Sequence, residues 1–152
     1  MTAYEKLGAN RLFKGLPRGA LQPVYERGVT IKVDAGDVLI REGQTNKHLY
    51  LVLHGEVEVR LPDSPERFTE VRLGTRGPGS CLGEYSLIDK KPASATVVAT
   101  RPSELFKISH ETFYELLKTD HALGSAVYRH LFVHLVDRLR ATDAWLDLIR
   151  PL

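Results

Sequence analysis

The sequence predicts an α+β protein, mainly β, in which an antiparallel jelly-roll β-barrel is flanked by short N-terminal helices and a long C-terminal helix. Three observations support this fold class. Apolar residues recur at helical spacing before residue 28, alternate with a period of two up to residue 108, and then return to helical spacing. Turn residues separate the alternating stretches at close intervals, as in antiparallel sandwiches. We therefore expect a single domain over residues 1–152, with helices in 1–28, the barrel in 29–108 and helices in 109–149.

The segment from residue 7 to about residue 27 is expected to form two short helical pieces. Apolar residues fall at helical spacings between residues 7 and 27, but Gly15, Pro17 and Gly19 interrupt the pattern. Proline removes a backbone donor and clashes with the preceding turn, so one continuous helix does not fit this segment.

Alternation with a period of two predicts the strands. Val29, Ile31 and Val33 alternate with polar residues, as in a strand that has one buried face. Further strands are predicted at 38–40, 49–53, 56–61, 68–73, 94–99 and 105–108. The 49–53 strand is apolar throughout and is expected to be buried, whereas Val71 and Leu73 are expected to be the inward residues of the 68–73 strand.

Two helices are predicted after residue 108. Ser109 suits the N-cap of the first, and Asp120 suits the N-cap of the second. The second helix is expected to run unbroken to about residue 149, a length of about 40 Å at 1.5 Å per residue.

This long helix carries more apolar surface than one barrel needs for cover. One stripe, with Thr142 inside it, is formed by Leu131, Leu135, Leu139, Leu146 and Ile149. A second apolar set lies off the stripe and is formed by Phe132, Val136 and Trp145. A second apolar face favours a partner helix, so we expect a homodimer through this helix. The alternative is a single helix packed lengthwise on its own domain.

Composition and charge restrict the function classes. The 152 residues are 43% hydrophobic and 26% charged, and a net charge of +2 with interspersed signs does not indicate a nucleic-acid surface. The single cysteine, Cys81, excludes an internal disulfide and is expected to be a small buried hydrophobe rather than a redox sensor. There is no signal-peptide pattern and no apolar run of about 20 residues, so we expect a cytoplasmic protein without membrane contact.

No pattern of catalytic or metal-binding residues stands out. Serine, histidine and aspartate are present, but no nucleophile elbow frames them. His130 and His134 have the spacing that holds a metal from one helix face, yet no third ligand accompanies them. His48 and His54 are the only histidines of the strand region, without the clustered histidines of cupins. We expect neither an enzyme nor a metal site.

The segment from Gly79 to Val97 is the most informative part of the chain. It indicates a loop, a short turn beginning at Gly83-Glu84, and a strand beginning near Ser94. Upstream, the stretches AGDVLIREG and LYLVLHGEVEV place glycines at tight turns between strands. In this order the motifs resemble cyclic nucleotide-binding domains, and 79–97 resembles their phosphate-binding cassette. The resemblance covers about residues 12–149.

The resemblance implies a ligand site in the cassette, for cyclic AMP, cyclic GMP or another cyclic nucleotide. By motif position, Glu84 would accept a hydrogen bond from the ribose 2′-hydroxyl. The amides of Gly83 and of the Ser94–Ala95 step would face the sugar phosphate. The Ser94 hydroxyl would add a donor, as in the bacterial catabolite-activator branch, and Ser86 belongs to the same candidate set. Without a ligand, Glu84 is alternatively a structural carboxylate that accepts from loop amides.

Two cassette residues depart from the family pattern. Ala93 stands where the family has the arginine that pairs with the phosphate. Losing such a contact costs about 2–5 kcal/mol, or about 30-fold to several thousand-fold in affinity. Lys90 and Lys91 either reach in from the preceding loop or are solvated. Tyr85 replaces a small or aliphatic residue, and its ring either lines the pocket and stacks on a base or is buried with its hydroxyl at the surface.

The long helix adds a further match. Residues 137–143 resemble the dimerisation helix of the catabolite-activator branch, where hydroxyl residues reach the adenine. Thr142 is therefore either a base contact or a polar residue in the dimer seam, and Asp143 replaces a second small polar residue. Members of that branch carry a DNA-binding helix-turn-helix after this helix, whereas only three residues follow Ile149 here, so direct DNA binding is not expected.

Two functions follow from these patterns. The first is a stand-alone sensor or regulatory domain, in which ligand binding in the cassette is coupled to the C-terminal helix and to a protein partner that the sequence does not identify. The alternative is a degenerate, ligand-independent interaction or dimerisation module, which the alanine at position 93 favours.

Overall fold

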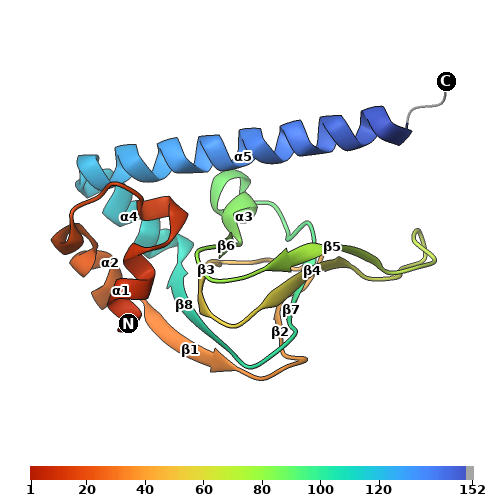
Figure 1. Ribbon diagram of the computed structural model, residues 1–152, viewed down its shortest axis with the longest axis horizontal. Coiled ribbons are helices and arrows are strands. Elements are labelled where there is room, and N and C mark those ends of the chain that lie inside the picture. Colours follow the sequence, from red (N-terminus) through yellow and green to blue (C-terminus); the bar gives the residue numbers. More distant parts are fainter. Residues whose placement is uncertain (150–152) are drawn as a thin grey trace.

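A computed structural model describes residues 1–149, whose elements follow the predicted order (Figure 1). The helices are α1 (Ala3–Gly8), η1 (Arg11–Phe13), η2 (Arg18–Leu21), α2 (Gln22–Arg27), α3 (Glu84–Asp89), α4 (His110–Thr119) and α5 (His121–Ile149). The strands are β1 (Val29–Val33), β2 (Val38–Ile40), β3 (His48–His54), β4 (Val57–Leu61), β5 (Val71–Arg76), β6 (Cys81–Leu82), β7 (Thr96–Ala99) and β8 (Ser103–Ser109). After α1, the segment for which two helical pieces were expected contains three, namely η1, η2 and α2.

The strands form two four-stranded antiparallel sheets, in the orders β1-β8-β3-β6 and β2-β7-β4-β5. The predicted antiparallel fold with flanking helices is confirmed. The predicted closure into a barrel is not observed, because no ladder joins the two sheets within residues 1–149. The edge strands β2 and β6 have only three and two residues, too few to continue the hydrogen-bonded ladder from one sheet into the other.

Within the first sheet, strand β3 is buried on both faces, which explains its apolar run. Leu49, Leu51 and Leu53 pack toward the helices, in a cluster that includes Phe113 of α4. Their neighbours along the strand, such as Val52, pack in a second cluster between the two sheets. Successive side chains of a strand point to opposite faces, so a strand between two cores is apolar throughout.

Val71 and Leu73 are not buried as predicted, although Leu73 lines a pocket wall. The strand begins three residues later than expected, and these side chains are 41% and 45% exposed. β5 is the outermost strand of its sheet, and its register against β4 shifts next to Gly74, whose φ is 130°. Such an irregularity interrupts the alternation of inward and outward residues, and an edge strand has cover from one neighbour only.

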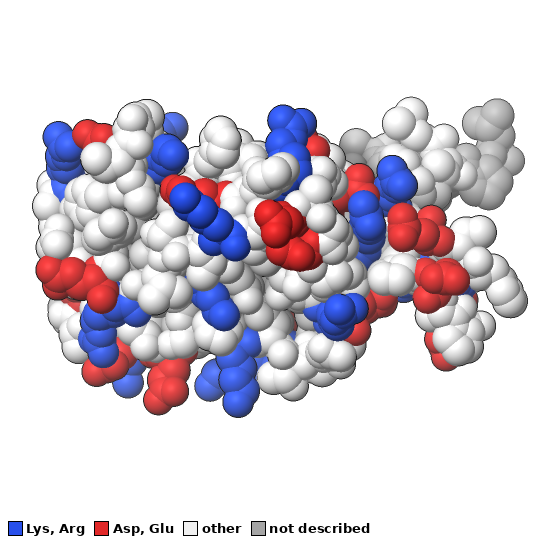
Figure 2. Space-filling model, turned by 90° about the horizontal axis from the view of Figure 1, so that it is seen from below, with Lys and Arg blue, Asp and Glu red and all other residues white. Residues whose placement is uncertain are grey.

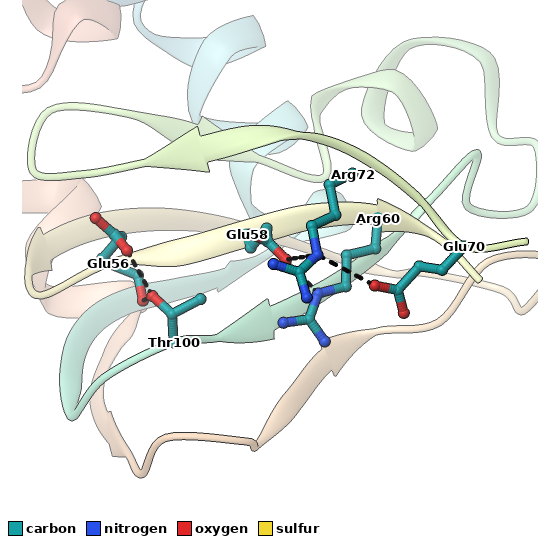
Figure 3. Close-up of polar contacts among 6 residues, drawn as sticks. All are labelled: Glu56, Glu58, Arg60, Glu70, Arg72 and Thr100. Carbon is teal, nitrogen blue, oxygen red and sulfur yellow. Dashed lines mark hydrogen bonds and ion pairs between the residues drawn. The ribbon is translucent and has the colours of Figure 1, made fainter.

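Charged side chains are packed along β4 and its neighbours (Figure 3). Glu58 is 8% exposed, and its carboxylate contacts Arg60 on the same strand and Nε of Arg72 on β5 at 3.7 Å. Near the start of β4, the Thr100 hydroxyl donates to Oε1 of Glu56 at 2.7 Å. A buried carboxylate is tolerated only when it is paired, and the contacts with Arg60 and Arg72 pair Glu58.

The long helix α5 extends across one side of the molecule above α3 (Figure 1). Both predicted N-caps are confirmed: Ser109 Oγ accepts from the N–H of Thr112, and Asp120 Oδ1 accepts from the N–H of Leu123, each at 3.1 Å. The first half of α5 packs on η1 and α4. Every residue from 139 to 149 is exposed, so the second half has no cover from its own chain.

The face away from α5 shows acidic and basic side chains interspersed, without a patch of one sign (Figure 2). Of the helices in residues 1–149, none has the length and apolar character needed to span a membrane.

Candidate ligand-binding site

A pocket of about 300 Å³ lies where α3, the loop before β7 and α5 approach one another. This volume is at the lower end of the range for small-molecule sites. All the predicted site residues except Thr142 line it: Gly83, Glu84, Tyr85, Ser86, Ala93, Ser94 and Ala95. The rest of the wall is mostly apolar, from Ile40, Val59, Leu61, Leu73, Leu82 and Val97, with two polar additions, Asn46 and Arg138.

Gly83 makes the turn from β6 into α3. Its φ is 84°, and a Cβ at this position would lie 2.4 Å from the carbonyl oxygen of His48. Only glycine fits both the backbone conformation and the close approach. The Gly83 carbonyl accepts from Nε2 of His110 at 3.1 Å, and burial lowers the pKa of that imidazole.

Glu84 is the first residue of α3 and is only 5% exposed. It is the acidic residue of the first helical turn, a position where the helix dipole favours a negative charge. Its Oε1 lies 3.4 Å from Nε2 of His134, a residue of α5 that is 9% exposed. The cassette carboxylate therefore faces the long helix as well as the pocket.

The loop between α3 and β7 is held from two sides. The Ser86 hydroxyl donates to the carbonyl of Lys91 at 3.0 Å, so it closes the loop on itself. The N–H of Ala93 donates to the carbonyl of Gln44 at 2.9 Å. The predicted strand start at residue 94 is two residues early, because Ser94 and Ala95 precede β7. Within residues 1–149 no backbone acceptor takes the N–H of either residue, so both donors are free at the pocket wall.

Tyr85 and Arg138 form the edge of the pocket nearest α5. Tyr85 is 38% exposed, and its ring centroid lies 5.7 Å from Cζ of Arg138. Arg138 is the only lysine or arginine among the lining residues. Sequence reasoning did not select it, although it lies one helical turn before Thr142 in the segment that resembles the dimerisation helix. That spacing was the signal that could have identified it.

The two loop lysines are placed away from the pocket. Lys90 lies with Nζ 6.0 Å from the ring centroid of Tyr114 on α4, and Lys91 is exposed. Thr142 is also exposed, and its hydroxyl donates to the carbonyl of Arg138 at 3.0 Å within the helix. Its contact with a base or with a second helix stays a prediction.

The remaining candidates have packing roles in this structure. Nδ1 of His130 lies 2.8 Å from the carbonyl oxygen of Leu12, and Nδ1 of His134 lies 3.0 Å from Nη1 of Arg11. In the described part of the chain, no group of three or more histidine, cysteine or acidic residues is arranged to hold a metal. Cys81 is 4% exposed, and burial raises the pKa of its thiol, in agreement with the expected buried hydrophobe.

A larger groove of about 1090 Å³ lies on the other side of α3, against α4. It shares Asn46 and Ser86 with the smaller pocket but does not include Glu84 or the 93–95 loop. The smaller pocket is therefore the one that brings the cassette residues together.

Comparison with known proteins decides the family. Residues 30–120 match the cyclic nucleotide-binding domain family. The chain belongs to this family. The resemblance that its motifs indicate is thus confirmed, and every residue that lines the pocket except Arg138 lies within the matched range.

Related cyclic nucleotide-binding domains occur in fungal and bacterial proteins. The chain is 33% identical over 114 residues to the cAMP-dependent protein kinase regulatory subunit of Yarrowia lipolytica. The matched region is 75% of this chain but only 28% of that protein. The catabolite activator protein of Thermus thermophilus has a similar structure, with a TM-score of 0.80 and 28% identity over 92% of this chain and 63% of that one. A cyclic nucleotide-binding domain from Methylobacillus flagellatus gives a TM-score of 0.78 and 27% identity, and the match covers 97% of this chain and 80% of that one.

Proposed function

We propose that this cyclic nucleotide-binding domain is a regulatory sensor that binds a cyclic nucleotide in the 300 Å³ pocket and transmits binding through α5. One observation carries the proposal: the same pocket contains the carboxylate of Glu84, the free N–H groups before β7 and the guanidinium of Arg138. A cyclic nucleotide offers a hydroxyl donor, a phosphate anion and an aromatic base, which these groups complement. The proposal is a binding function without catalysis, in the cytoplasm.

Arg138 is the proposed counter-charge for the phosphate. Ala93 leaves the cassette without an arginine, and neither Lys90 nor Lys91 lines the pocket. A charge-assisted hydrogen bond is about twice as strong as a neutral one, so a cation matters for anion affinity. Because this cation is on α5, an anion in the pocket would attract the helix directly.

The coupling to α5 rests on two contacts between that helix and the cassette. Glu84 faces His134, and Tyr85 lies under Arg138. A ligand that contacts Glu84 and Arg138 together favours one position of α5 over others, and this difference in affinity is what shifts a conformational population.

Calorimetric titration tests the binding function. Wild-type protein is titrated with cyclic AMP, cyclic GMP and cyclic dinucleotides, beside Glu84→Gln and the exposed control Glu66→Gln. We expect Glu84→Gln to weaken cyclic nucleotide binding by about 10-fold to 100-fold, as for a lost hydrogen bond to a charged group, and Glu66→Gln to have no effect. Wild-type protein that gives neither heat nor a thermal shift at millimolar ligand would overturn the proposal.

The regulatory proposal includes a homodimer through α5. Large apolar side chains of this helix are more than 40% exposed, and they are Tyr128, Phe132, Val133, Val136, Leu139, Trp145, Leu146, Leu148 and Ile149. A second copy of the same helix would cover them by antiparallel or parallel packing. Sedimentation is expected to give a dimer for the wild type and for Arg140→Gln, and a monomer for Leu139→Glu. A wild-type monomer at high protein concentration would contradict this part.

Ala93 supports a second candidate, a ligand-independent interaction or dimerisation module. On this alternative Glu84→Gln leaves partner binding intact, whereas charged substitutions at Leu135 or Leu139 abolish it. Wild-type binding of a cyclic nucleotide that depends on Glu84 would exclude the alternative.

A further inference from the structure

His134 connects the cassette to two other parts of the chain. From α5 its imidazole presents Nε2 to Oε1 of Glu84 on α3 at 3.4 Å, and Nδ1 to Nη1 of Arg11 on η1 at 3.0 Å. His134 and Glu84 are 9% and 5% exposed, so water has little access to the contact. Three elements that are far apart in the sequence therefore meet at one ring.

The contact with Arg11 fixes the tautomer of that ring. A guanidinium has only donors, so Nδ1 of His134 must accept from it and carries no hydrogen. The imidazole is then neutral, with its hydrogen on Nε2. Within residues 1–149, Nε2 makes no hydrogen bond of good geometry, and the nearby carboxylate of Glu84 is the acceptor that lies 3.4 Å away.

This buried donor favours a hydrogen bond with Glu84. Leaving a buried N–H unsatisfied costs about 1–3 kcal/mol, and a shift of a few tenths of an ångström brings 3.4 Å into the normal range. Oε1 of Glu84 then accepts from Nε2 of His134, whereas Oε2 remains free to accept a hydrogen bond from a ligand in the pocket.

Cations from three elements surround the pair. Arg11 contributes from η1, Arg76 from the end of β5 and Arg138 from α5. Burial and the neighbouring Arg138 lower the pKa of Arg76, while Glu84 acts in the opposite sense. The titratable neighbours also include Tyr85 and the thiol of Cys81, and burial raises the pKa of that thiol. The Glu84 charge is thus balanced by fixed cations, and a neutral imidazole is sufficient to orient it.

We propose that His134 is a positioning residue for Glu84, a neutral imidazole whose tautomer Arg11 sets, and that it orients the carboxylate to accept a hydroxyl group of a phosphate-bearing ligand. This inference rests on the proposed function for its ligand. It adds that the N-terminal turn η1 contributes to ligand selection, although it does not line the pocket.

Two substitutions separate the two contacts of the ring. In His134→Gln the amide nitrogen takes the place of Nε2 and can still donate to Glu84. In His134→Asn the amide oxygen takes the place of Nδ1 and can still accept from Arg11, but no donor reaches Glu84. His130→Ala is the control, because it removes the contact with Leu12 that docks η1 without touching Glu84.

Binding is measured with cyclic AMP and 2′-deoxy-cyclic AMP. We expect His134→Gln and His130→Ala to keep the wild-type preference for the 2′-hydroxyl within about 3-fold. We expect His134→Asn to lower that preference about 10-fold or more, the size of a misplaced hydrogen bond to a charged group. An unchanged preference in His134→Asn would overturn the inference.

Nitrogen-15 NMR of the histidine rings tests the tautomer without any ligand. In the full chain at pH 7.5, His134 is expected as the neutral Nε2–H form, and Arg11→Met should produce a mixture of tautomers. A ring protonated on Nδ1 in the wild type would overturn the inference even if cyclic nucleotides bind. If the Nε2–H tautomer is found and no nucleotide binds, the proposed function fails while the positioning of Glu84 stands.

Discussion

The guanidinium carbon of Arg138 lies 5.7 Å from the ring centroid of Tyr85, so a cation from the C-terminal helix covers an aromatic side chain of the cassette. Such a cation–π contact contributes about 0.5–1 kcal/mol at an exposed site. It also holds the guanidinium at the pocket edge. This guanidinium is on α5, whereas the arginine that pairs with the phosphate in the family is usually in the cassette. Among the residues that line the pocket, the positive charge thus comes from α5 and not from the cassette.

Removing the charge of Arg138 is expected to weaken cyclic nucleotide binding. Arg138→Gln should lower the affinity for cyclic AMP by about 30-fold or more, because the loss of a charge pair costs about 2–5 kcal/mol. Isothermal titration calorimetry measures the change, with Arg140→Gln on the exposed side of the same helix as the control. Equal affinities of Arg138→Gln and the control would show that the phosphate finds its donors elsewhere.

Restoring an arginine in the cassette is expected to strengthen binding. Ala93 lines the pocket, so Ala93→Arg should raise the affinity for cyclic AMP by at least about 30-fold, by the same charge-pair energy. The added guanidinium would lie near Arg138, and their repulsion should lower the melting temperature of the empty protein. Thermal scans with and without ligand check both effects, and Ala93→Gln provides a long uncharged side chain for comparison. A decrease in affinity on adding the arginine would be the contrary result.

Gly83 is expected to be indispensable for the cassette turn. Gly83→Ala forces a Cβ to 2.4 Å from the His48 carbonyl at a positive φ, whereas Gly79→Ala meets the same backbone strain in open space. The strain alone costs about 1–2 kcal/mol. Urea unfolding should therefore show a clearly larger loss of unfolding free energy for Gly83→Ala than for Gly79→Ala. Similar losses in the two variants would mean that β3, which carries the His48 carbonyl, can shift to make room for the added Cβ at little cost.

Stability is expected to fall as the pH drops below the usual histidine pKa of 6.5. Burial lowers the pKa of His110 in the folded protein, so the unfolded chain binds more protons in this range. The free energy of unfolding therefore rises with pH in this range. The contribution of His110 to it is fully present above pH 6.5 and is lost as the pH falls toward the depressed pKa. Burial also lowers the pKa of His48, which adds to the same slope.

The corresponding experiment is urea unfolding between pH 5 and 8. His110→Gln keeps a donor for the Gly83 carbonyl but cannot titrate, so its stability should depend less on pH than that of the wild type. The exposed His121→Gln should retain the wild-type slope. An identical slope in His110→Gln would assign the pH dependence to other groups.

The parts of the fold with local signals could be predicted from the sequence. Ser109 and Asp120 carry cap chemistry, and the apolar run of β3 reports burial on both faces, so these features are where the pattern predicts them. The strand β5 has no such signal. Its exposure depends on an edge position and on a register shift beside Gly74, which are properties of the sheet rather than of the segment.

The candidate site also contains residues that a local sequence signal predicts and residues that no such signal predicts. Its cassette residues are contiguous and have a recognisable order, whereas Arg138 and His134 are about fifty residues away along the chain. Whether Arg138 reaches the pocket and His134 reaches Glu84 depends on the direction in which α5 crosses α3, and no short pattern encodes that angle. The contact between His134 and Arg11 also requires the docking of η1, which the N-terminal glycines and prolines did not reveal.

The single tryptophan of the chain, Trp145, lies on the uncovered half of α5 and is 59% exposed. Intrinsic indole fluorescence excited at long wavelength therefore comes from one place, about 10 Å along α5 from Arg138. Its emission maximum should move to shorter wavelength when that half of the helix becomes covered, and should stay unchanged by a ligand that affects only the pocket. The protein thus contains its own optical reporter of events at the end of the helix.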